Sequence, residues 1–200
     1  MNNFTDNKNI KYSLEAYNDG YDFSILSLED QEATKSYYWS MQSMYELADA
    51  TQVYNFIIKN KNNGVISLVK KSWTFDKSGT YKGIILDARN SMKQGNDAVI
   101  LDILINSREI KHVKMTHDST NVILGALLEK YDNLIGLIDL SELIGCVVGI
   151  EVENITSSSG NVFSKLIDFV FWDDDIVNLL YDMIDIMQNQ DSENTDKEII

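Results

Sequence analysis

The chain has 200 residues, with 17 basic and 31 acidic side chains and a formal net charge of −14. Hydrophobic residues make up 44% of it and aromatic residues 10%, which is enough to bury a core and excludes a chain that is disordered throughout. No apolar run approaches the length of a membrane-spanning helix, and the N-terminal residues lack the apolar stretch of a signal peptide, so we predict a cytoplasmic protein without a membrane partner.

The acidic excess is concentrated near the C-terminus. Residues 1–63 carry five basic and nine acidic side chains, residues 64–172 carry eleven and thirteen, and residues 173–200 carry one and nine, for net charges of −4, −2 and −8. The middle of the chain is therefore nearly neutral, and the charge of the whole chain says little about what this part binds.

The first 70 residues contain sequence patterns of loops, helices and strands. Residues 1–25 combine Asn, Asp and Tyr without a clear period, which predicts a loop or a short strand. Ser27 precedes two acidic residues and resembles a helix N-cap, and apolar side chains then recur at helical spacing from residue 37 to 48. Two β-rich segments, 53–58 and 65–69, flank an Asn-Gly turn. We predict an N-terminal helix-and-hairpin extension over residues 1–70.

The segment 71–172 alternates apolar and polar residues between turn signals. Strands are predicted at 79–91, 97–107, 108–116, 146–155 and 161–172, with a helix at 118–133 and a short capped turn at 141–145. Three strands, a helix and two strands is the element order of the OB-fold. The predicted class is mainly β with flanking helices: a five-stranded OB-like Greek-key barrel over 71–172, with its helix between strands three and four.

The C-terminal end completes the predicted organisation. Residues 173–190 form an acidic amphipathic helix, whose first aspartates favour the helix N-terminus by charge–dipole attraction. Residues 191–200 are predicted to be a disordered acidic tail.

No enzyme signature is found. Gly79 and Gly83 lie within a strand and lack the Lys-Ser/Thr step of a phosphate-binding loop. A metal site at His112, His117 and Asp118 is weighed against two polar residues on a half-exposed strand and loop, and the second interpretation is preferred. The single cysteine, Cys146, reads as a buried thiol. We predict a non-enzymatic protein with no catalytic residues, no metal and no cofactor.

Three stretches between residues 78 and 172 carry a resemblance: "SGTYKGIILDARNSMKQGNDAVILDILI", "ILGALLEKYD" and "IDLSELIGCVVGIEVENITSSSGNVFSKLIDF". They resemble the small single-stranded-DNA-binding-like proteins of phages and mobile elements. The resemblance implies an OB-fold that binds single-stranded nucleic acid during replication or recombination, in the cytoplasm of the host cell. The acidic C-terminal end with Ile199 and Ile200 resembles the tail tip by which bacterial single-stranded-DNA-binding proteins recruit partner enzymes, although it lacks the familiar Pro and Phe; a simply solvated tail stays open.

Rings and cations interleave along the predicted barrel, as single-strand binding requires. We predict that Trp73, Tyr81 and Phe163 stack on bases. The side chains predicted to contact phosphates are Lys82, Arg89, Lys93, Lys114 and Lys165. The hypothesis requires these groups to share one trough, whereas an ordinary barrel places lysines on its wet face and rings in its core.

The alternative belongs to another class. A compact chain of charge −14 can act as an acidic phage-type inhibitor or DNA mimic that binds a host-defence or nucleic-acid-processing protein. Residues 1–70 and the helix 173–190 would then form the binding surface. Under either hypothesis, the sequence leaves assembly into a homo-oligomer open.

Overall fold

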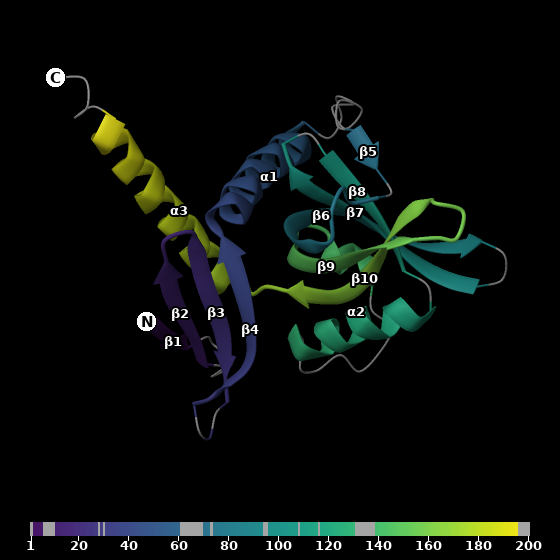
Figure 1. Cartoon of the computed structure of the whole chain (residues 1–200), viewed down its shortest axis with the longest axis horizontal. Helices are drawn as coiled ribbons and strands as arrows, with labels where there is room; N and C mark the ends of the chain where they lie inside the picture. Colours follow the sequence, from purple (N-terminus) through teal and green to yellow (C-terminus); the bar gives the residue numbers. More distant parts are fainter. Residues whose placement is uncertain are drawn as a thin grey trace. The chain divides into compact units, whose positions relative to one another are not determined.

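The structure of the chain, a computed structural model, describes residues 2–5, 11–27, 29, 31–60, 70–72, 74–93, 96–107, 109–115, 117–130 and 139–195. These residues form strands β1 to β10 and helices α1 to α3, which confirms the predicted mainly β class with flanking helices (Figure 1). The chain divides into two compact units. We call residues 1–45 with 178–200 the N-terminal unit, and residues 46–177 the central unit.

The N-terminal unit is built on an antiparallel sheet in the order β1-β2-β3-β4. Its strands are β1 (Asn2–Thr5), β2 (Lys11–Tyr17), β3 (Gly20–Leu26) and β4 (Ala33–Ser40). One face holds the buried side chains of Leu14, Phe23 and Trp39. Of the two alternatives predicted for residues 1–25, a loop or a short strand, the strand is observed, three times over. The helix predicted from Ser27 begins only at Met41, because residues 33–40 pair with β3 as strand β4.

Helix α1 (Met41–Lys59) begins directly after β4. The Ser40 hydroxyl accepts a hydrogen bond from the backbone N–H of Ser43 at 3.1 Å, which is the contact of a helix N-cap. The predicted strand at 53–58 lies inside this helix, because Leu47, Ala50 and Ile57 recur at helical spacing and are buried. The second strand of that predicted hairpin, 65–69, lies outside the described residues.

The central unit contains a six-stranded sheet in the order β10-β9-β6-β7-β8-β5. Its strands are β5 (Lys70–Ser72), β6 (Gly79–Lys93), β7 (Asn96–Asn106), β8 (Glu109–Met115), β9 (Val147–Thr156) and β10 (Val162–Phe171). The boundaries of β6 to β10 agree with the five predicted strands to within two residues, whereas the short β5 was not predicted. Helix α2 (His117–Lys130) connects β8 to β9 through a short 3₁₀ helix, η3 (Leu140–Leu143).

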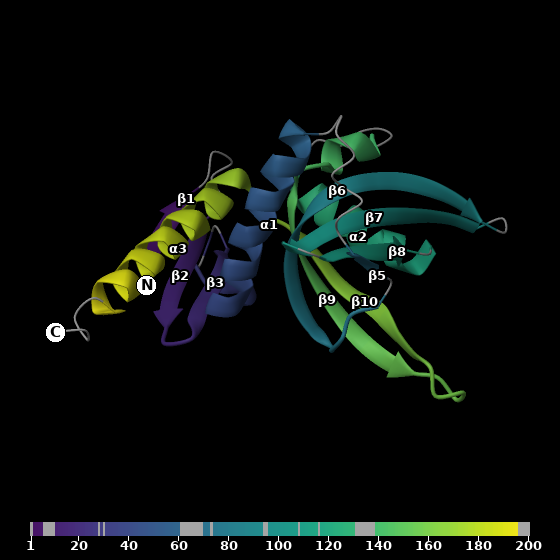
Figure 2. The ribbon, with the colours of Figure 1, turned by 90° about the horizontal axis from the view of Figure 1, so that it is seen from above.

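Strand β6 is shared by two halves of this sheet: one half contains β9 and β10, and the other contains β7, β8 and β5. Its residues 79–84 pair with β9, and its residues 84–93 pair with β7. An ideal Cβ at Gly83 would stand 2.5 Å from the Leu104 carbonyl oxygen, so only glycine fits where β6 changes partners. The two halves therefore diverge from β6, as seen from above in Figure 2.

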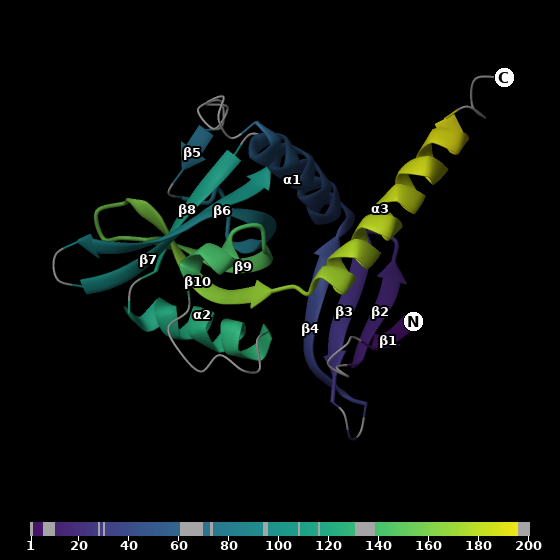
Figure 3. The same cartoon turned by 180° about the vertical axis from the view of Figure 1, so that it is seen from behind.

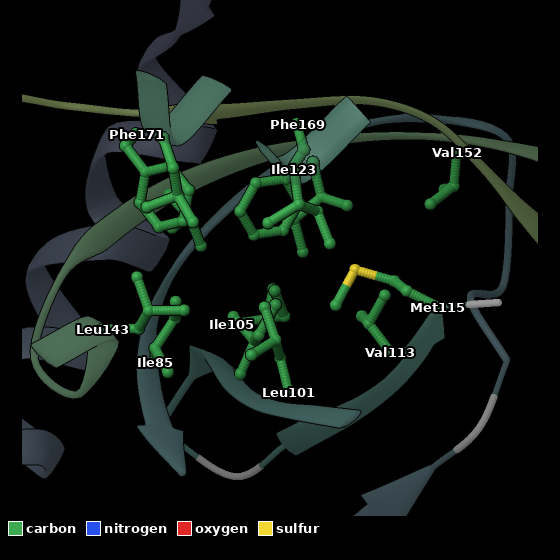
Figure 4. Close-up of a cluster of buried hydrophobic side chains, with 14 of the residues drawn as sticks. Ile85, Leu101, Ile105, Val113, Met115, Ile123, Leu143, Val152, Phe169 and Phe171 are labelled. Atoms are coloured by element: carbon green, nitrogen blue, oxygen red, sulfur yellow. The ribbon is translucent and has the colours of Figure 1, made fainter. Parts of the chain in front are cut away.

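The core of the central unit fills the space between these two halves. Figure 4 shows Phe169 and Val152 of one half facing Leu101 and Val113 of the other. Helix α2 packs against β10 (Figure 3). The Lys130 ammonium donates to the Trp172 carbonyl at 2.9 Å and fixes the end of that helix.

The strand ladder is open. Parallel pairing joins β8 to β5, and within the described residues no ladder joins β8 to β10. A five-stranded barrel would need that last pairing to close. The predicted element order is observed, whereas a closed barrel is not.

Helix α3 (Asp174–Thr195) follows β10. The backbone N–H groups of Ile176 and Val177 donate to the Asp173 carbonyl, so the predicted acidic start of the helix is confirmed. Residues 191–195, predicted to be disordered, continue this helix, and residues 196–200 lie outside the described part. Among the helices of the described chain, none is both long and apolar enough to cross a membrane.

Candidate functional site

The face of β6, β7 and β8 that points away from the core carries two cross-strand rows that contain charged side chains. Register places Arg89 beside Ile100, and Ile100 beside Lys114. The adjacent row contains Asp87, Asp102 and His112. We call this surface the outer face of β6–β8.

Ion pairs connect the two rows. Nη1 of Arg89 donates to Oδ2 of Asp87 at 2.5 Å and to Oδ2 of Asp102 at 2.9 Å. The His112 Nδ1 also contacts Oδ1 of Asp102. The Asp102 side chain is 7% exposed, against 41% for Arg89 and 49% for Asp87. A buried carboxylate held by two partners is a structural anchor, because a buried charge must be paired.

The Arg89 guanidinium responds to the same contacts. Its hydrogen bond to Asp102 is the largest influence that raises its pKa above the ordinary value. Arg89 therefore stays charged, but the two carboxylates offset much of its field. Because 41% of its side chain is exposed, it can still meet a phosphate.

Lys114 contributes a second cation to this face, and its side chain is exposed beside Ile100. Lys93 pairs with Asn96 at the end of the same β6–β7 ladder. Its side chain lies outside the described residues. Three predicted phosphate-binding positions, Arg89, Lys93 and Lys114, therefore lie in the two adjacent ladders of β6–β7 and β7–β8.

Lys82 does not belong to an exposed surface. It pairs with Gly149 and is 2% exposed, and the Trp172 indole nitrogen lies 3.3 Å from where a Cβ at Gly149 would stand. Burial lowers the pKa of Lys82 to about 8. Burial argues against its predicted phosphate contact, because a buried ammonium has no access to a nucleic-acid backbone.

Tyr81 lies on the core side of β6. Its hydroxyl donates to the Lys77 carbonyl at 2.7 Å, and its ring centroid lies 4.6 Å from that of the buried Phe75. Burial is also the main cause that raises the pKa of the Tyr81 hydroxyl. The ring is occupied by core packing, so its predicted stacking on a base is not supported.

Phe163 and Lys165 are exposed, but they lie in the other half of the sheet. They pair with Ile155 and Glu153 on the face of β9 and β10 that points away from the core. The core side chains shown in Figure 4 lie between the two halves, and this surface and the outer face of β6–β8 are on the sides of those halves that point away from the core. The core therefore lies between the two surfaces, and they do not form the single trough that the hypothesis requires.

Three predicted residues lie outside the described chain: Trp73, Ile199 and Ile200. The carboxylates Asp87 and Asp102 were missed. The available signal was the alternation of Asp87 with Arg89 in a predicted strand, which indicates a shared face but not a cross-strand partner. Across the described residues, no group of three or more His, Cys, Asp or Glu side chains is arranged to hold a metal ion.

Neither a protein-family profile nor a curated protein matches this sequence.

Proposed function

We propose that the central unit is an OB-like module whose outer face of β6–β8 binds single-stranded nucleic acid without catalysing a reaction. Apart from the short β5, its strands follow each other in the OB order, with α2 between the third (β8) and the fourth (β9). In OB-folds the face of strands two and three binds oligonucleotides. Here those strands are β7 and β8.

The observation that carries this proposal is the row that joins Arg89, Ile100 and Lys114. It combines two cations with an apolar side chain on one continuous sheet face. Asp87 and Asp102 in the neighbouring row offset this charge, so attraction to phosphates is modest. With about two phosphate contacts, the logarithm of the affinity for a single strand should fall with the logarithm of salt concentration with a slope of about −1 to −2.

The test is a fluorescence-anisotropy titration of the full chain with labelled oligo-dT at low salt. Lys114→Glu replaces an attraction with a repulsion and should weaken binding roughly tenfold. Lys165→Glu is the matched control, since it makes the same change on the opposite side of the core and should leave affinity unchanged. Equal losses in both variants, or no binding of the wild type at micromolar protein, would contradict the proposal.

A second candidate function is supported by the distribution of charge between the units. The N-terminal unit has four basic and 13 acidic residues in 68 positions, whereas the central unit has 13 and 18 in 132. Their net charges are therefore −9 and −5. We propose as the alternative that this acidic unit binds the basic surface of a nucleic-acid-processing or host-defence protein. In a pull-down from host lysate, a nucleic-acid-binding enzyme released by salt would support this alternative.

A further inference from the structure

The polar face of the N-terminal sheet presents two tyrosines to solvent. Tyr17 is 49% exposed and Tyr38 is 43% exposed. Glu15 and Asp22 stand on the same face, and Asp19 lies in the turn between β2 and β3. We call these five residues the tyrosine face.

Strand register assembles this face. One cross-strand row contains Glu15, Asp22 and Tyr38, and the next pairs Tyr17 with Gly20. An ideal Cβ at Gly20 would stand 2.6 Å from the Tyr38 hydroxyl and 2.7 Å from its Cζ atom. The glycine thus makes room for the Tyr38 ring to lie across β3, which brings it toward Tyr17.

Carboxylates surround the two phenol hydroxyls. A hydrogen bond with Glu15 is the main cause that raises the pKa of Tyr17, and Asp22 adds to the effect. Partial burial is the main cause for Tyr38, followed by a hydrogen bond with Asp19. The hydroxyl ends of both rings are therefore held by acidic groups, while much of each ring is exposed.

This combination selects one kind of cation. A guanidinium stacks on a phenol ring and forms paired hydrogen bonds with a carboxylate, whereas an ammonium is a compact, strongly hydrated point charge. A nucleic acid is excluded as the occupant by charge repulsion. Tyrosine is also enriched where proteins contact one another.

We infer that the tyrosine face docks an arginine-bearing basic segment of a partner protein. The inference rests on the second proposed function, in which the acidic N-terminal unit binds a basic surface. It adds the location of the contact and the side chain that is recognised.

The test compares two labelled peptides of equal length and charge, one with arginine and serine and the other with lysine and serine, titrated against the full chain. Stacking on two rings should make the arginine peptide bind about three- to tenfold tighter. Tyr17→Leu combined with Tyr38→Leu should abolish this preference and keep the residual charge attraction. Tyr17→Phe, which keeps the ring, should retain the preference.

Phe56→Leu is the matched control, because Phe56 is another exposed ring, 54% accessible, on α1. This variant should leave the preference unchanged. If both peptides bind equally well to the wild type, the tyrosine face is refuted while the acidic docking function stands. If neither binds, both fail. Circular dichroism of the double leucine variant checks that it folds. If it does not fold, the single variant Tyr17→Leu is measured instead and should reduce the preference for the arginine peptide about twofold. An unchanged preference in that variant would refute the inference.

Discussion

The two units differ in where charged side chains lie beside aromatic rings. In the central unit, Lys82, Asp102 and Lys111 are buried, and the Phe75 ring lies in the core. In the N-terminal unit, carboxylates surround the exposed rings of Tyr17 and Tyr38. A buried charged side chain affects the stability of the fold. An exposed charged side chain can exchange its water for a ligand with little effect on that stability.

Lys111 is a buried cation of the central unit whose ammonium is held by several contacts. Its ammonium donates to the Thr74 carbonyl at 2.8 Å and to Oε1 of Glu109 at 2.6 Å. It also lies 5.0 Å from the centroid of the Phe75 ring. This basic residue is therefore part of the packing around a core ring.

The largest effect is expected from breaking the buried ionic anchor. Asp102→Asn removes the charge that Arg89 and His112 both contact, and should lower the free energy of unfolding by about 3–4 kcal/mol. Asp87→Asn is the control, because this half-exposed carboxylate should contribute about 1 kcal/mol or less. Urea unfolding measures both. Similar losses would mean that burial does not distinguish the two carboxylates.

The next effect has the opposite sign. Burial lowers the pKa of Lys82 from 10.5 to about 8, so below pH 8 the fold carries the cost of a buried charge. Lys82→Met removes that cost and should raise the free energy of unfolding at pH 7 by about 2–3 kcal/mol.

The pH dependence provides the check. Between pH 8 and 10.5 the unfolded wild-type chain binds more protons at Lys82 than the folded chain does, so wild-type stability rises in that window. The advantage of Lys82→Met should therefore shrink as the pH increases from 8 to 10. A difference that is the same at pH 7 and pH 10 would show that burial of the charge is not its cause.

The smallest effect is expected on the tyrosine face. Tyr17→Leu should change the free energy of unfolding by about 0.5 kcal/mol or less, because the ring is half exposed and lies outside the core. Thermal unfolding followed by circular dichroism measures this change. A loss of 2 kcal/mol or more would make this ring a structural element, as Tyr81 is in the central unit.

The sequence predicted the strands of the central unit because apolar side chains recur at every second position and the strands end at clear turns. Val99, Leu101 and Ile103 point to a buried face in any such strand. The N-terminal strands were missed because tyrosines occupy both faces of the sheet, so that Tyr12 and Tyr17 blur the alternation. The Ser27 signal also competed with the true cap, Ser40, which only the hydrogen bond to Ser43 identifies.

The candidate site was predicted in part, for a related reason. Alternation shows that Arg89 and Lys114 each share a face with the residues two positions away in their own strand. It does not show on which side of the core that face lies. Asp102 and His112 become partners only through the register of β7 and β8. The two halves diverge from β6, so Phe163 and the outer face of β6–β8 lie on different sides of the core. No local pattern around Phe163 in the sequence indicates on which side it lies.

The shared strand has a consequence for how the central unit comes apart. Ile84 pairs with Leu104 on one side and with Val147 on the other, so the same backbone segment closes both ladders. Neither half can open at that point without exposing the edge of the other. Opening of the two halves should therefore be a single cooperative event that starts at distant hairpin tips and reaches Ile84 last.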